Sequence, residues 1–366
     1  MTYDLIVIGG GPAGCSTAIK LARVGARVLL LESGRYPRHR VCGEFVSAES
    51  LNLLASLLSG ATRELVHNAP RISQSRVFAD GAPLYLPIDP PAASIPRFDL
   101  DRALWDSCLE AGVDARQGCP MRSIHGDGPF TVNANGEQFQ ARALVNAAGR
   151  WSSLTSHSVR ARAVDQRWIG VKAHFVERNP SPTVDLYFCD GGYCGVQPIS
   201  SQDADGDTRL INACAMFRAD VATNLPDIFA THPTLRERSR DWQIASDPVR
   251  TSPLVFHKPE PVQGTMLQVG DAATFVDPFI GDGISLALRS GAFAAECLTT
   301  FLQDACTLRE AASQYAGLYL QRLAPVFRAS SVLRNLLRVP SLIRRPAMSL
   351  LQYTPSLSRQ LVRMTR

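Results

Sequence analysis

The sequence predicts a two-lobed α/β fold, and three observations support this. The chain opens on a continuous apolar run at residues 3–9, which a glycine-rich turn and a helical stretch connect to a second run at 26–32. Uninterrupted apolar runs are typical of parallel strands covered on both faces. Between residues 168 and 250 the pattern changes to alternating strands separated by Gly and Asp clusters, which is typical of an antiparallel sheet. A chain of 366 residues is long enough for two such lobes and a tail.

The first turn predicts a Rossmann-like dinucleotide site. Residues 9–14 read Gly-Gly-Gly-Pro-Ala-Gly, and Glu32 ends the second apolar run. In this pattern Gly9 makes the tight turn, Gly11 lets the backbone approach a pyrophosphate, and Gly14 lets the helix pack closely on the strand. The helix N-terminus attracts phosphate, and the acid accepts from ribose hydroxyls. The alternative is a purely structural glycine turn. The residues predicted to bind the dinucleotide are Gly9, Gly11, Pro12, Ala13, Gly14, Glu32 and Ser33.

The following elements alternate between the two lobes. We expect helices at 48–58 and from Arg102 to Gly112, the latter capped by Asp99 or Asp101, and a hairpin turn at Asp80-Gly81. Further strands are expected at 143–149, 170–176, 184–188, 209–217 and 264–270, before a long helix that ends near residue 301. The predicted nucleotide-binding lobe comprises residues 1–72, 97–160 and 255–310, the antiparallel substrate lobe residues 73–96 and 161–254, and a basic helical region residues 311–366.

Composition limits the class of protein. The longest apolar runs fall short of the roughly 18 residues that a membrane span needs, and the N-terminus enters a strand without a leader pattern, so we expect a cytoplasmic protein. The nine cysteines are scattered and form no CxxC pair, which indicates free thiols and argues against a metal site or a disulfide framework.

The C-terminal region carries the positive charge. Residues 311–366 hold nine arginines and no acidic residue, whereas the whole chain has a net charge of +5. In residues 321–338 arginines alternate with apolar residues at three- and four-residue spacing, which predicts peripheral contact with the inner face of an anionic membrane or closure over a lipid-filled cavity. The alternative is a helix docked on the nucleotide-binding lobe with solvated arginines. Nucleic acid is not an expected partner, because no aromatic residues interleave with the charges.

Four segments resemble one family. They are residues 9–14 with Glu32, residues 40–47 (Arg-Val-Cys-Gly-Glu-Phe-Val-Ser), residues 97–101 (Arg-Phe-Asp-Leu-Asp), and residues 269–273 continuing to Pro278, Gly281, Gly283, Ser290 and Gly291. In order and spacing they are similar to flavoproteins of the para-hydroxybenzoate hydroxylase fold, within its geranylgeranyl reductase-like and halogenase-like branch. The resemblance runs from residue 3 to about residue 300.

This resemblance implies FAD as the cofactor. It places Arg40 and Arg97 beside the phosphates or the flavin edge, Asp271 at the ribityl chain, and the helix after Gly283 with its N-terminus toward the flavin. For Gly270-Asp271 the alternative is a strand-end turn that caps a helix. The cofactor residues implied in addition to those of the first turn are Arg40, Arg97, Gly149, Gly270, Asp271, Pro278, Gly281, Asp282, Gly283 and Ile284.

The resemblance also implies catalytic residues. It places Cys42 and Gly43 near the flavin and substrate, with Glu44 as a proton donor or acceptor. The alternative is that Cys42 packs and Glu44 caps the helix that begins near Ser47. Residues 187–198 are similar to the Gly-Tyr-x-Trp-x-Phe-Pro stretch of geranylgeranyl reductases and place Tyr193 in the wall opposite the flavin, or, as the alternative, in the core. Gly195 and Gln197 replace the two bulky aromatics, which suggests a wider pocket or a different substrate shape.

Two departures from the family bear on the reaction. Hydroxylases of this fold carry an Asp-Gly pair where this chain has Ala148-Gly149, so reduction by NADPH in their familiar way is not expected. The Gly-Trp-x-Trp-x-Ile-Pro segment of flavin halogenases is missing, which argues against tryptophan-type halogenation. Only one dinucleotide fingerprint is present, so electrons would come from transiently bound NAD(P)H or from a separate reductase or ferredoxin.

The leading hypothesis is an FAD-dependent oxidoreductase acting on a lipophilic small molecule, isoprenoid or polyketide-like. It would reduce a double bond with hydride from flavin N5 and a proton from Glu44 or water. The alternative is a monooxygenase that hydroxylates an aromatic or polyketide substrate through a flavin hydroperoxide. A third hypothesis is a non-catalytic flavin- or lipid-binding carrier, which would not need the Gly281-Asp282-Gly283 turn at the flavin.

Overall fold

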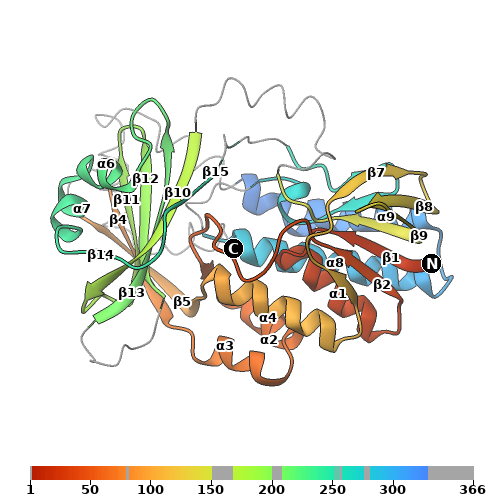
Figure 1. The fold of residues 1–366 in the computed structure, drawn as a ribbon. Helices are drawn as coiled ribbons and strands as arrows, with labels where there is room; N and C mark the ends of the chain where they lie inside the picture. The colour runs from red at the N-terminus through yellow and green to blue at the C-terminus, as the bar shows by residue number, and fades with distance from the viewer. Residues whose placement is uncertain are drawn as a thin grey trace.

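The computed structural model describes residues 2–79, 82–150, 168–199, 208–251, 254, 258–275 and 281–328. These residues form two parts, each built on its own sheet, as Figure 1 shows. The two-lobed mixed α/β fold is therefore confirmed. Pro278, the Asp80-Gly81 turn and the tail beyond residue 328 lie outside the described residues.

The first sheet has a parallel centre. In the order β6-β2-β1-β9-β17 each neighbouring pair of strands is parallel, and β16 then adds an antiparallel edge. The bounds are β1 Thr2–Ile8, β2 Val28–Leu31, β6 Asp114–Arg116, β9 Glu137–Asn146, β16 Val262–Gln263 and β17 Met266–Gln268. A hairpin of β7 (Met121–His125) and β8 (Phe130–Ala134) extends from β9. The central strand β1 is buried because both faces of the sheet are covered.

The first sheet is surrounded by helices that pack on it or on one another. They are α1 (Pro12–Arg23), α2 (Ala48–Leu57), α3 (Glu64–His67), α4 (Arg97–Glu110), α8 (Gly283–Leu302) and α9 (Leu308–Arg322), with a short 3-10 turn at Gly60–Arg63. Helices α1 and α8 pack against each other most closely, and a Cβ at Gly291 of α8 would lie 2.2 Å from the Ala13 carbonyl oxygen. This close approach brings the glycine-rich turns before α1 and before α8 to the same end of the lobe.

The second sheet is antiparallel except where β11 pairs with β4. Its strands run in the order β14-β10-β13-β12-β11-β4-β5-β3, and β15 also pairs with β10. The bounds are β3 Phe45–Val46, β4 Arg71–Phe78, β5 Leu84–Ser94, β10 Trp168–Arg178, β11 Thr183–Cys189, β12 Gly192–Pro198, β13 Thr208–Arg218, β14 Gln243–Ile244 and β15 Val249–Thr251. Helices α6 (Leu225–Ala230) and α7 (Pro233–Arg238) cover its outer face, at the left of Figure 1. The opposite, inner face supplies the side chains that meet the first lobe.

No helix among the described residues is long and apolar enough to cross a membrane. All nine cysteines are unbridged, and the described residues hold no cluster of side chains suited to a metal ion.

Candidate functional site

The turn between β1 and α1 fits a pyrophosphate. A Cβ at Gly9 would lie 2.3 Å from the Ala147 carbonyl oxygen, and one at Gly14 would lie 1.9 Å from the Gly9 carbonyl oxygen. At Gly11, by contrast, no described atom lies within 4 Å of such a Cβ, so the backbone faces open space. No described side chain caps α1, and its first turn carries no acidic residue. The free N–H groups of this helix end can therefore receive an anion, as the sequence predicts.

Glu32 holds the segment after β2 in place. Its side chain is 4% exposed and accepts from the Gly10 N–H (2.8 Å), the Gly34 N–H (2.7 Å) and the Arg38 guanidinium (2.7 Å). Burial alone would raise the pKa of Glu32, but the Gly34 N–H and Arg38 outweigh it and hold the pKa below its usual value. An ionised acceptor thus stands beside the glycine turn, as the ribose role requires. The sequence singled out Arg40 and not Arg38, because a single chain does not show which arginine folds back.

The two predicted arginines differ in their surroundings. Arg97 forms a two-pronged ion pair with Asp101 (both N–O distances 2.7 Å), so its charge is already balanced. Helix α4 begins at Arg97 rather than Arg102, and Asp101 is buried within it, so the expected cap at Asp99 or Asp101 is wrong. Arg40 is exposed and has no ion pair within the described part of the chain. Of the two, Arg40 can bind a phosphate without breaking an ion pair, whereas Arg97 would first have to release Asp101.

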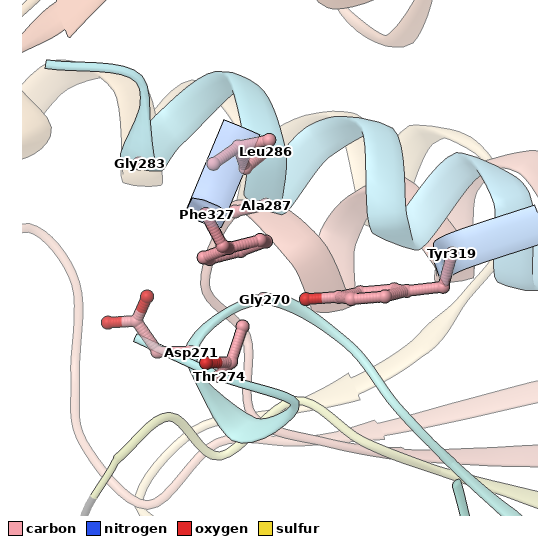
Figure 2. Close-up of a pocket in the computed structure, with 8 residues that line it drawn as sticks. All are labelled: Gly270, Asp271, Thr274, Gly283, Leu286, Ala287, Tyr319 and Phe327. Carbon is pink, nitrogen blue, oxygen red and sulfur yellow. The ribbon is translucent and has the colours of Figure 1, made fainter. Parts of the chain in front are cut away.

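Gly270 and Asp271 come together with the start of α8 in one pocket. Its lining residues are Gly270, Asp271, Thr274, Gly283, Leu286, Ala287, Tyr319 and Phe327 (Figure 2). Figure 2 shows the Tyr319 hydroxyl directed toward the Gly270 turn, while the Asp271 carboxylate points away from that ring. The Gly270 N–H donates to the Ser290 hydroxyl (2.9 Å), which fastens this turn to α8. The pocket unites three residues that the sequence predicted, Gly270, Asp271 and Gly283.

The start of the basic C-terminal region forms part of this pocket. Tyr319 lies on α9, and Phe327 follows it, with the two rings stacked at 6.3 Å. Leu323, Ala324 and Val326 are buried, whereas Arg322 and Arg328 are exposed. Residues 321–328 therefore dock on the nucleotide-binding lobe with solvated arginines, which the sequence offered as the alternative.

Glu44 forms a buried ion cluster between the two lobes. Its side chain is 0% exposed, and its carboxylate accepts from the Lys172 ammonium, the His174 ring (2.8 Å) and the Arg97 main-chain N–H (2.9 Å). Burial would raise the pKa of Glu44, but the hydrogen bond from His174 and the charge of Lys172 outweigh it and lower the pKa. Glu44 therefore stays ionised. It does not cap the helix after Ser47, because it meets the start of α4 instead.

Glu44 also has a positive φ of 61°. Non-glycine residues adopt this conformation at a cost, so the three bonds to its carboxylate stabilise a strained turn. The two preceding residues, Gly43 and Cys42, have different surroundings. A Cβ at Gly43 would meet no described atom within 4 Å. Cys42 accepts a hydrogen bond from the Asn212 amide at its carbonyl oxygen (3.0 Å), and burial raises the pKa of its thiol, which stays neutral.

The inner face of the antiparallel sheet has a polar half. Cross-strand pairing sets Lys172 opposite Cys214, His174 opposite Asn212, and Asn212 opposite Gln197. The Gln197 amide donates to the Ser94 hydroxyl (2.8 Å) and is 2% exposed, so it fastens β12 to β5 instead of facing a cavity. The contacts of Lys172 and His174 with Glu44, and of Asn212 with Cys42, join this half to the segment 40–47.

The other half of the inner face is apolar. Phe188, Tyr193 and Met216 form a buried cluster with Val77, Leu84 and Leu254, and Phe275 of the first lobe packs against it. The rings of Phe188 and Tyr193 lie 5.5 Å apart. A Cβ at Gly195 would lie 3.4 Å from Leu186, so Leu186 borders the space that the missing aromatic side chain would fill.

Arg150 lies between Phe275, which packs on the apolar half, and Asp271, which lines the pocket. Its guanidinium lies 4.1 Å from the centre of the Phe275 ring and 3.7 Å from the Asp271 carboxylate. The preceding Gly149 has a φ of 76°, which only glycine adopts readily. A positive side chain therefore follows Gly149 beside the pocket. No role was predicted for Arg150, which occupies an unspecified position in the stretch 148–152, or for Phe275, which no motif contains.

The sequence profile of one family, described as FAD binding domain, matches residues 2–311. The chain belongs to this FAD-binding family. It is 25% identical over 320 residues to the 1H-pyrrole-2-carbonyl-[peptidyl-carrier protein] brominase of Pseudoalteromonas luteoviolacea, covering 81% of this chain and 77% of that protein. It is also 25% identical over 330 residues to the menaquinone reductase of Mycobacterium tuberculosis, covering 81% of this chain and 76% of that protein.

A solved structure shares the fold. The geranylgeranyl bacteriochlorophyll reductase-like protein of Thermoplasma acidophilum matches with a TM-score of 0.79 and 20% identity, over 100% of this chain and 95% of that one. The resemblance seen in the sequence is thus confirmed, and the chain is an FAD-dependent oxidoreductase rather than a carrier. The open turn at Gly11, the ionised Glu32 and Arg40, which forms no ion pair with another described residue, fit the ADP half of FAD.

Proposed function

We propose that this FAD-dependent enzyme reduces a carbon–carbon double bond of an apolar, isoprenoid-like molecule. The observation that carries the proposal is the apolar half of the inner sheet face, where Phe188, Tyr193 and Met216 lie against Phe275. Phe275 directly follows Thr274, which lines the pocket beside α8 together with Gly270 and Asp271. An apolar wall next to the FAD-binding lobe suits a hydrocarbon chain and excludes water from a hydride transfer.

Two of the similar proteins support this choice. One is named a menaquinone reductase and another a geranylgeranyl bacteriochlorophyll reductase-like protein. Both names refer to reductases and to molecules with isoprenoid chains.

The chain's own residues would bind FAD, orient the substrate and supply a proton. The turn at Gly11 and Arg40 would hold the pyrophosphate, Glu32 the ribose, and Asp271 the ribityl hydroxyls. Bound FAD supplies the hydride. Glu44 is not the proton donor in this proposal, because its ionised carboxylate is fixed to Lys172 and His174. The hydroxyl of Tyr193 stands within the apolar cluster, and we assign it the proton.

The test is anaerobic turnover. FAD-loaded protein, reduced with dithionite, is incubated with a prenylated quinone or a geranylgeranyl lipid, and the products are analysed by mass spectrometry. We expect a product that has gained two hydrogens. Tyr193→Phe should lower the rate of product formation by about 100-fold, within the range for general acids, and leave FAD binding unchanged. Tyr85→Phe is the matched control, because Tyr85 is 55% exposed on β5. No reduced product from any prenyl compound would overturn the proposal.

An oxygen-dependent reaction is the second candidate. Similarity to the brominase over 81% of the chain favours it. The same assay distinguishes it, because hydroxylation or halogenation requires oxygen, and halogenation also requires bromide or chloride. A product that gains oxygen only when air is supplied, or a halogen only when both air and the halide salt are supplied, would establish this second function.

Two further proposals rest on the sequence. The first is that electrons come from transient NAD(P)H or from a separate reductase or ferredoxin, which anaerobic bleaching of the flavin by each donor would distinguish. The second is that the basic region beyond residue 328 contacts an anionic membrane surface, which sedimentation with anionic and neutral vesicles would test.

A further inference from the structure

The turn before α8 contains a buried acid, Asp282, to which the proposed function assigns no task. Asp282 is 2% exposed, and neither of its carboxyl oxygens has a hydrogen-bond partner among the described residues. It occupies the N-cap position of α8 without accepting from the helix N–H groups. A buried polar group without a partner is costly and rare, so this carboxyl needs a physical reason.

The surroundings of Asp282 come from two segments. Gly281 packs on the Phe45 ring, where a Cβ would lie 3.2 Å from the nearest ring atom. The hydroxyls of Ser47 and Ser285 bond to each other (2.8 Å) and lie close enough to the carboxyl to lower its pKa, but burial outweighs them. The charged groups that act on it are Arg289, about two turns along α8, and Glu49 on α2. No cation within the described residues forms an ion pair with Asp282.

The position of Asp282 links it to the cofactor pocket. The adjacent Gly283 and Leu286, from the first turn of α8, line the same pocket as Asp271. The N-terminus of a helix carries a partial positive charge, which a negative side chain at the same end would offset. Burial raises the pKa of Asp282 to about 6, so the carboxyl changes its charge within the physiological range.

We propose that Asp282 is a positioning acid whose ionisation sets the positive potential that the start of α8 presents to FAD, and thereby the potential at which FAD is reduced. Reduced FAD is negatively charged at neutral pH, so it repels an ionised carboxyl at the same helix end and favours the protonated form of Asp282. Reduction would therefore be accompanied by uptake of one proton from solvent, which forms the O–H bond of Asp282. This inference is independent of whether the enzyme then reduces or oxygenates its substrate.

The test is the midpoint potential of bound FAD between pH 5 and 8. Above pH 6 the wild-type potential should fall more steeply with pH than that of Asp282→Asn, by up to one extra proton per two electrons. The two proteins should agree at pH 5, and the variant should have the higher potential at pH 8. Glu296→Gln is the matched control, because it removes an exposed carboxylate from α8 that is not among the groups acting on Asp282. Parallel curves for the wild type and Asp282→Asn would overturn the proposal.

A second measurement, which does not require bound FAD, tests the proposal even if the variant loses FAD. In the apoprotein, the melting temperature of Asp282→Asn should exceed that of the wild type above pH 6 and match it at pH 4. A difference that does not change with pH would show that the carboxyl does not titrate, and would equally overturn the proposal.

Discussion

Two buried carboxyl groups in contacting segments behave in opposite ways. Glu44, in the segment 40–47, has three hydrogen-bond donors, and its pKa is lowered. Asp282, in the turn packed on Phe45 of that segment, has none among the described residues, and burial raises its pKa to about 6. Burial alone therefore does not fix the charge of an acid. The hydrogen-bonding and charged partners decide it, and here they give one structural anion and one titratable group in two turns that pack on each other.

The largest expected effect comes from removing a partner of Glu44. Lys172→Met keeps the volume but leaves a buried carboxylate short of its cation, and it should destabilise the protein by roughly 3–5 kcal/mol. Urea unfolding of the apoprotein measures this. Glu44→Gln should cost a similar amount, because Lys172 is also fully buried.

The double variant completes this cycle. Glu44→Gln combined with Lys172→Met leaves no buried unpaired charge, so it should be less destabilised than the sum of the single variants. Additive losses would show that the two side chains do not stabilise each other and that the cluster is not an ion pair in solution.

Replacing Asp282 should stabilise the protein, whereas replacing Glu44 or Lys172 should destabilise it. Its pKa is about 6 in the folded protein and 3.8 in the unfolded chain, so the unfolded state releases its proton first as pH rises. Stability is thus lost between about pH 4 and pH 6. Asp282→Asn should recover up to about 3 kcal/mol at pH 8 and nothing at pH 4. Urea unfolding at both pH values checks this, and a loss of stability at pH 8 would contradict it.

A smaller effect should appear as a slope at low pH. The pKa of Glu44 is lower in the folded protein than the usual 4.5, so its contribution is present above that pH and is lost as pH falls below it. The wild type should lose at most about 1.4 kcal/mol per pH unit from this group. Glu44→Gln should lack this component of the slope, and identical slopes in both proteins would show that Glu44 is not ionised.

This comparison also shows what the sequence could predict. The turn at Gly9–Gly14 and the turn at Gly281–Gly283 were found because each depends on a few consecutive residues with one backbone task. The role of Glu44 was not found, because its partners Lys172 and His174 lie 128 and 130 residues along the chain. Their strand reads as an ordinary half-buried strand until it is paired. Arg150, Phe275 and Phe327 were missed for the same reason, since tertiary packing alone brings Phe327 to the pocket and sets Arg150 against Phe275 and Asp271.

The smallest change in stability is expected for Glu49→Gln, which tests whether burial is the reason that Glu44 matters. Glu49 lies on α2, two residues beyond Ser47, but its side chain is exposed. Glu49→Gln removes the same charge as Glu44→Gln from nearly the same place, and solvent screens it. Its unfolding free energy should change by no more than about 0.5 kcal/mol at any pH. A change as large as that of Glu44→Gln would mean that net charge around residues 44–49, rather than burial and pairing of Glu44, determines the stability of this segment.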